Sequence, residues 1–203
     1  GSAIQRPEDL AGKRIGVPEW AQTAGVYGRG FLSDYLGIDL KGITWVQSGV
    51  NQAGRAEKVK LHLPEGMRYH PVKDKSLNDM LMSGELDAVM SARPPIALGK
   101  GVVRLMPDYQ AAEEQYFRDT KIFPIMHGLV VRGPVLQEHP WVAMNLVKAF
   151  TQAKHQSMER LSDVTASHAP FAWMAEYANR MKSIFGEDFF PYGIGPDAGG
   201  QIN

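Results

Sequence analysis

Short apolar runs alternate with polar and amphipathic segments over the first half of the chain. The runs have the length and composition of strands, and they lie at residues 14–17, 43–46, 67–72 and 85–90. A long polar segment with two glycines, residues 48–65, separates the second run from the third. The pattern predicts four strands.

Two helices are predicted between these strands. Apolar residues recur at helical spacing from Thr23 until Gly37 closes the segment, and Ser76 begins a second, short helix that ends at Gly84. Strands joined by single helices are typical of a parallel sheet with helical crossovers. We therefore expect residues 7–118 to form a nearly complete α/β lobe.

The second half of the chain has a different pattern. Residues 109–120 are predicted to form an acidic helix, and an apolar run at 123–131 predicts a strand that Pro124 limits to a sheet edge or a first position. Two longer amphipathic helices follow, one beginning near Pro140 and one ending at Gly186. One strand and two such helices cannot make a closed core, so we expect residues 122–203 to need further chain or a partner.

Composition excludes several classes of function. The 203 residues are 44% hydrophobic, which is typical of a soluble globular protein, and 22 Lys and Arg balance 22 Asp and Glu. A chain without net charge has no overall electrostatic field that would attract nucleic acid. The sequence contains no run of about 18 apolar residues, so it predicts no membrane span. The absence of cysteine excludes disulfides and thiolate chemistry, and it is compatible with both the cytoplasm and the periplasm. We expect a cytoplasmic protein, with the periplasm as the alternative.

Candidate chemistry lies where the first strand meets the first helix. Residues 18–23 follow that strand, at the position where open α/β sheets bind ligands and where a helix start favours an anion. We expect the Thr23 hydroxyl to cap its own helix rather than to contact a ligand. Glu19 is either a solvated loop glutamate or a group that acts as a base or accepts a ligand hydroxyl.

Further candidates follow other strands. Arg93 comes after the fourth strand, at the same carboxyl edge, and its guanidinium suits a carboxylate. His70 could reach this edge from the third strand, and His127 lies in the 123–131 strand, where a lone histidine is more often structural than catalytic. Local spacing builds no metal site, although His127, His70 and Glu19 could converge in space.

The order of motifs resembles the 4,5-dihydroxyphthalate decarboxylase family, whose members are similar to periplasmic binding proteins of the two-lobed type II fold. The most particular matches are Pro18-Glu19 with Thr23, the run at 123–127 and Pro140-Trp141. Weaker matches lie at residues 7–17, 29–30, 54–58, 80–88, 92–94, 149–150, 153–154, 185–186 and 192–193. Family members usually have tyrosine where this chain has Trp20, so an aromatic wall is kept and a hydroxyl is lost.

The resemblance implies an activity. It implies decarboxylation of a hydroxylated aromatic carboxylate, with His127 as general acid and Glu19 as base. Arg93 and the helix start at Thr23 would hold the retained carboxylate, and Trp20 and His70 would contact the substrate. No cofactor is required, although a divalent metal ion is compatible with this chemistry.

The resemblance also implies an organisation. Residues 7–118 correspond to the second lobe, and residues 122–203 to the crossover strand and helices of a first lobe that is incomplete in this chain. Members of the family have further residues before and after this stretch. The resemblance is also compatible with a homo-oligomer. The alternative function is a solute-binding protein for a small aromatic carboxylate in an ABC-type uptake system, with the same cleft and no proton transfer.

Overall fold

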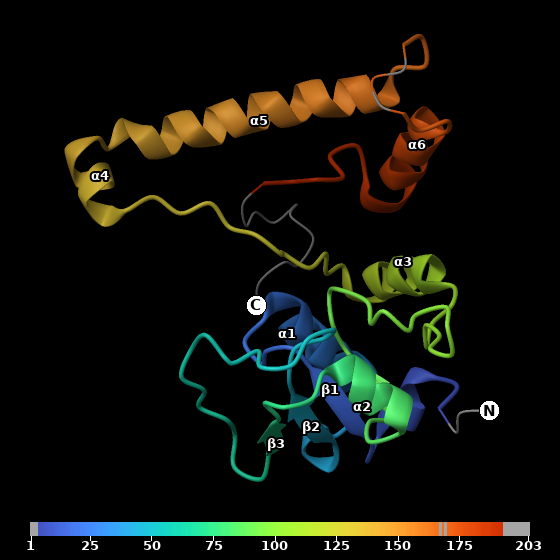
Figure 1. Ribbon diagram of the computed structural model, residues 1–203. Helices are drawn as coiled ribbons and strands as arrows, with labels where there is room; N and C mark the ends of the chain where they lie inside the picture. Colours follow the sequence, from blue (N-terminus) through green and yellow to red (C-terminus); the bar gives the residue numbers. More distant parts are fainter. Residues whose placement is uncertain (1–3, 167, 169, 193–203) are drawn as a thin grey trace. The chain divides into compact units, whose positions relative to one another are not determined.

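The protein is described by a computed structural model over residues 4–166, 168 and 170–192. The glycine-rich end at residues 193–203, including the last match to the family at Gly193, lies outside the described residues. The chain divides into two compact units, Gly1–Tyr109 and Gln110–Asn203, and each is described by itself (Figure 1).

The first unit is built on a four-stranded sheet in the order β3-β2-β1-β4, in which all neighbouring strands are parallel. Figure 1 labels β1, β2 and β3 of this sheet. The strands are β1 (Arg14–Val17), β2 (Thr44–Gln47), β3 (Arg68–Pro71) and β4 (Ala88–Val89). The predicted parallel α/β arrangement is confirmed. Only β4 is much shorter than predicted, because its ladder with β1 extends over Ile15 and Gly16 alone.

The helices of the first unit follow local signals in the sequence. They are the 3-10 turns η1 (Pro7–Leu10) and η3 (Leu40–Gly42), α1 (Thr23–Gly30) with the π-helical turn η2 (Phe31–Tyr35), and α2 (Leu77–Ser83). Ser76 caps α2 by accepting a hydrogen bond from the Asp79 N–H at 3.1 Å, and Gly84 ends it with φ 80°. Both ends of α2 are therefore as predicted.

Apolar side chains cover both faces of the sheet. Ile15, Val17 and Trp45 are buried in one cluster with Leu32 from η2. Successive residues of a strand point to opposite faces, and Gly16 faces the second cluster, which α2 forms. A Cβ atom at Gly16 would lie 2.8 Å from side-chain atoms of two buried residues in that cluster. Glycine at this position thus lets α2 approach the sheet closely.

Among the described residues the second unit is helical. Its helices are α3 (Tyr109–Thr120), which starts at the last residue of the first unit, α4 (Gly133–Glu138), α5 (Trp141–Ser162) and α6 (Met174–Phe185). Helix α3 matches its predicted bounds, Pro140 immediately precedes α5, and Gly186 follows α6, as predicted. Helices α5 and α6 contact each other, and Glu114 of α3 accepts two hydrogen bonds from Arg180 of α6.

The predicted strand at residues 123–131 is wrong. Residues 121–132 form neither helix nor strand, and His127 is exposed rather than buried. A strand must pair its backbone groups with a neighbouring strand, and the described part of this unit contains no other strand. Phe123 is instead held by ring contacts with Phe185 and Phe190 at centroid distances of 5.4 and 5.7 Å.

The second unit buries little apolar surface. Its buried described residues are Lys154, Ala178 and Phe189, while α5 exposes large apolar side chains at Trp141 and Met144. In the described ranges, no helix is both long and apolar enough to span a membrane.

Candidate functional site

Glu19 is buried directly after β1, at the carboxyl edge of the sheet. Its Oε1 atom accepts a hydrogen bond from Arg55 Nε at 2.7 Å, Arg55 Nη2 also contacts it, and Lys58 Nζ lies 3.9 Å away. The residue is therefore not a solvated loop glutamate. It is the anion of a cluster to which the long loop after β2 contributes two cations.

Trp20, the next residue, is fixed by hydrogen bonds to its backbone and by contacts with its indole ring. Its N–H donates to Glu57 Oε1, and its carbonyl oxygen accepts from Arg29 Nη2 at 2.7 Å. The Arg29 guanidinium lies 3.9 Å from the centre of the indole ring. Trp45 and Tyr69 pack edge-on against the same ring at 5.5 and 5.6 Å. The aromatic wall expected at Trp20 is thus a fixed part of the loop.

Burial changes the acid–base properties of the groups around Trp20. Burial raises the pKa of Tyr69, and so does the Glu57 carboxylate, which accepts a hydrogen bond from the Tyr69 hydroxyl at 2.9 Å. Burial lowers the pKa of Arg29 to about 10, so this side chain remains a cation at neutral pH. Two buried atoms in this group have no hydrogen-bond partner in the described structure, namely Arg29 Nη1 and Glu57 Oε2.

Gln47, at the end of β2, joins the two loops of the site. Its buried amide Nε2 donates to the carbonyl oxygens of Pro18 and Arg55, both at 2.8 Å. A tight turn follows β2, since a Cβ atom at Gly49 would overlap the carbonyl oxygen of Gln52. The backbone that carries Arg55 is therefore fixed beside the loop that carries Glu19.

The start of α1 differs from the prediction. Thr23 is not the N-cap: it is the first residue of the helix and is exposed, while Gln22 is the cap and has extended φ and ψ values of −67° and 131°. The extended conformation that a cap requires falls one residue earlier than expected. No side chain caps the helix, so its first N–H groups are available to an anion.

Arg93 and His70 both belong to the first unit, and neither forms a hydrogen bond or an ion pair with Glu19 in the described structure. Arg93 is exposed in the loop after β4, where its carbonyl oxygen accepts from Ser91 Oγ at 2.6 Å, and its side chain forms no hydrogen bond or ion pair with the described residues. His70 is exposed on β3, next to Tyr69, and alternation along a strand directs it away from the face that Tyr69 shares with Trp20.

His127 lies in the second unit, in the extended segment between α3 and α4. Among the residues that the structure describes, no group of three or more His, Cys, Asp or Glu side chains could hold a metal ion.

Sequence reasoning selects none of five residues that contact Glu19 or Trp20 through ion pairs, hydrogen bonds or rings, namely Arg29, Arg55, Glu57, Lys58 and Tyr69. Arg29 and Tyr69 lie in a predicted helix and a predicted strand, where no local pattern marks them as site residues. Arg55 and Glu57 belong to a dense run of charge in an otherwise polar loop, and this is the signal that could have found them. The remaining missed contacts are long-range, because Glu19 and Arg55 are 36 residues apart in sequence.

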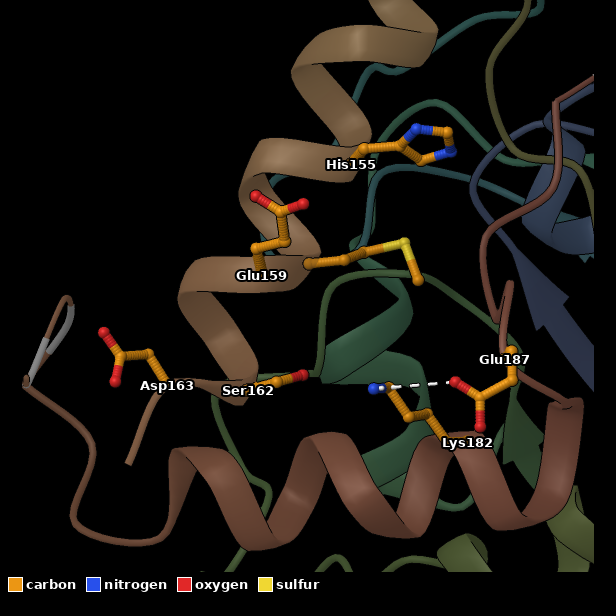
Figure 2. A pocket seen from close by; sticks show the side chains of 7 residues that line it. His155, Glu159, Ser162, Asp163, Lys182 and Glu187 are labelled. Atoms are coloured by element: carbon orange, nitrogen blue, oxygen red, sulfur yellow. Dashed lines mark ion pairs between the residues drawn. The ribbon is translucent and has the colours of Figure 1, made fainter. Parts of the chain in front are cut away.

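The second unit has a separate open pocket between α5 and α6 (Figure 2). It is lined by His155, Met158, Glu159, Ser162, Asp163, Lys182 and Glu187. Lys182 and Glu187 form an ion pair at 3.7 Å across one side of it (Figure 2). Hydrogen bonds from Thr165, with a smaller contribution from His168, lower the pKa of Asp163 to about 2. No residue predicted for catalysis lines this pocket.

The fold and the cluster around Glu19 define an α/β protein with a charged site at the carboxyl edge of a parallel sheet. Among known proteins, the chain is similar to the 4,5-dihydroxyphthalate decarboxylase of Comamonas testosteroni, with 37% identity over 199 residues, which is 96% of this chain and 60% of the relative. A protein of the same name from Pseudomonas putida is 40% identical over 119 residues, 57% of this chain and 46% of that relative.

These relatives confirm the resemblance to the 4,5-dihydroxyphthalate decarboxylase family. The chain spans about three fifths of the length of the Comamonas relative. No protein-family model matches the chain.

Proposed function

We propose that the protein decarboxylates a hydroxylated aromatic carboxylate such as 4,5-dihydroxyphthalate. The observation that carries this proposal is the similarity to a curated 4,5-dihydroxyphthalate decarboxylase along 96% of the chain. The parallel sheet with a charged site at its carboxyl edge supports it. For the same reasons we propose that the first unit is a lobe of a type II periplasmic-binding-protein-like fold.

The reaction must avoid a free aryl carbanion. We infer that a general acid protonates the ring carbon that bears the departing carboxylate, while a base takes the proton of the para hydroxyl. The ring is then a neutral dienone. Carbon dioxide leaves, the electron pair of the broken carbon–carbon bond restores the aromatic ring, and the base returns its proton to the phenolate oxygen. The net change is one proton taken up and one carbon dioxide released, without a cofactor.

The residue roles are part of the proposal. Glu19 serves as the base, because it is a buried carboxylate at the sheet edge beside the aromatic wall of Trp20. His127 serves as the general acid, and its exposure in the described structure leaves its ring accessible. Arg93, the uncapped start of α1 at Thr23 and His70 remain proposed contacts for the substrate.

The test is carbon dioxide release by the intact protein. Incubation with 4,5-dihydroxyphthalate should give one carbon dioxide per substrate. His127→Ala should lower kcat about 100-fold to 10,000-fold, the range expected for loss of a general acid, and leave substrate affinity nearly unchanged.

His155→Ala provides the matched control, because His155 is an exposed histidine of α5 that has no assigned role in the reaction. This variant should retain the parent's turnover. Unchanged turnover in His127→Ala would remove the histidine from the mechanism. Failure of the parent to release carbon dioxide from any hydroxylated phthalate or benzoate would refute the proposed activity.

A further inference from the structure

We propose that Arg55 and Lys58 bind the carboxylate of the ligand, and that Glu19 occupies these two cations until the ligand replaces it. The inference rests on the proposed function for the class of ligand, an aromatic carboxylate. It places the anion clamp on the long loop after β2, whereas the sequence had suggested Arg93.

The exposure of the three side chains shows which of them a ligand can reach. The Glu19 side chain is only 8% exposed, while that of Arg55 is 41% exposed and that of Lys58 is 78% exposed. The cations therefore face solvent and the carboxylate lies beneath them. A dissolved anion meets Arg55 and Lys58 before it can meet Glu19.

The cluster also has unused capacity for an anion. Two cations share one carboxylate, which leaves an excess of one positive charge. Lys58 Nζ lies 3.9 Å from Glu19 Oε1, beyond hydrogen-bond range, and forms no other hydrogen bond with the described residues, so its N–H donors remain available. A guanidinium can bind a carboxylate through two parallel hydrogen bonds, which makes Arg55 the stronger half of the clamp.

Arg29 and the start of α1 adjoin the same loop, where the Glu57 carboxylate opposes the charge of Arg29. Arg29 is buried, and a Cβ atom at Gly25 in the first turn of α1 would lie 3.1 Å from its Nη1 atom, which has no partner. The same turn has no side-chain cap. The uncapped helix start favours an anion close to residues 19–25, and the unpartnered Arg29 Nη1 atom offers it a hydrogen-bond donor.

Exchange of partners would couple binding to the chemistry. When the ligand carboxylate takes Arg55 and Lys58, Glu19 loses the cations that stabilise its charge. The Glu19 oxygens released from these cations can then accept a hydrogen bond from the ligand hydroxyl. The backbone of Arg55 stays fixed through Gln47, so only side chains need to move.

The experiment measures the Kd of phthalate by isothermal titration calorimetry with the intact protein. Phthalate has both carboxylates but no hydroxyl group, so it cannot enter the proposed reaction. Arg55→Gln should weaken binding about 10-fold to 100-fold, as loss of a charge-assisted pair predicts, and Lys58→Met should weaken it several-fold. Arg55→Lys should restore part of the affinity.

Glu19→Gln gives the sharper result, because it removes the internal competitor. It should tighten phthalate binding several-fold and lower kcat on 4,5-dihydroxyphthalate. A residue that only supports the fold would not move these two quantities in opposite senses. Lys60→Met is the matched control, because Lys60 is exposed in the same loop and has no ion pair with the described residues.

Three results would overturn the inference: no phthalate binding by the parent, an unchanged Kd in both Arg55→Gln and Lys58→Met, or weaker binding by Glu19→Gln. Lys58 is exposed enough that its replacement should not disturb folding, so one variant remains informative if Arg55→Gln is unstable. If phthalate binds as expected but 4,5-dihydroxyphthalate releases no carbon dioxide, the clamp stands and the decarboxylase proposal fails. If carbon dioxide is released and the variants change neither Kd nor KM, the clamp fails alone.

Discussion

Gly16 lies in the centre of the strand that leads to Glu19, and its replacement tests the packing that supports the site. Gly16→Ala would place a Cβ atom 2.8 Å from Leu77 Cδ2 and from Leu86 Cδ1, and 3.3 Å from Val89 Cγ2. Carbon atoms attract optimally at about 3.5–4.0 Å, so both leucines must retreat by more than about half an ångström. Both are buried in the α2 cluster and have little room to do so.

The expected cost follows from these distances. Overpacking of a close-packed core costs about 1–3 kcal/mol, and replacing glycine by alanine offsets about 0.4–1 kcal/mol of this by restricting the unfolded chain. We expect Gly16→Ala to lower the free energy of unfolding by about 1–2 kcal/mol. Gly16→Val, with two more methyl groups in the same space, should cost about 3 kcal/mol or more.

Urea unfolding followed by tryptophan fluorescence is the appropriate assay. Trp45 is fully buried in the first unit, whereas Trp141 and Trp173 of the second unit are already exposed, so most of the spectral change should report on the first unit. Gly30→Ala is the control, because a Cβ atom there would meet nothing closer than 3.8 Å, and it should stabilise by about 0.5–1 kcal/mol. A Gly16→Ala protein as stable as the parent would refute the close approach of α2 to β1.

Two further predictions concern pH. Tyr69 has a pKa raised above its ordinary value of 10.0 by burial and by Glu57, so its contribution to stability is complete below that pH and is lost as pH rises through the raised value. Tyr69→Phe should lower the free energy of unfolding by about 1 kcal/mol at neutral pH. In urea titrations its free energy of unfolding should fall less than that of the parent as pH rises above about 10, and an identical fall would contradict this reasoning. The Arg14 guanidinium lowers the pKa of Asp87 below 3.8, so the stability from this pair is present above that value and is lost as pH falls through the lowered pKa. Asp87→Asn should therefore lower the thermal midpoint at neutral pH, and this difference should shrink in acid; a difference independent of pH would exclude the ion pair as its cause.

The sequence predicted elements well where the determining signals are local. Ser76 and Gly84 specify the two ends of α2 within a few residues of the helix itself. The prediction of a strand at residues 123–131 is wrong because apolar composition is a local property, whereas strand pairing depends on residues far away in the sequence. A segment of this composition becomes a strand only where a neighbouring strand can accept its hydrogen bonds.

In the candidate site, too, the sequence predicts the position of a residue along the chain but not its long-range contacts. Glu19 could be chosen from sequence, because its place after the first strand puts it at the carboxyl edge of a parallel sheet. Arg93 was chosen by the same rule, yet its side chain forms no ion pair with the described residues, since an edge position does not determine where a loop side chain points.

By itself the sequence determined the order of strands and helices in the first unit and the place of Glu19, because alternation, caps and glycines act over a few residues. Only the tertiary structure decided that Arg55 and Lys58 surround Glu19 and that Arg29, Glu57 and Tyr69 enclose Trp20. These contacts depend on how a long polar loop folds over the sheet edge. That path is set by buried hydrogen bonds such as those of Gln47, which no local pattern of residues encodes.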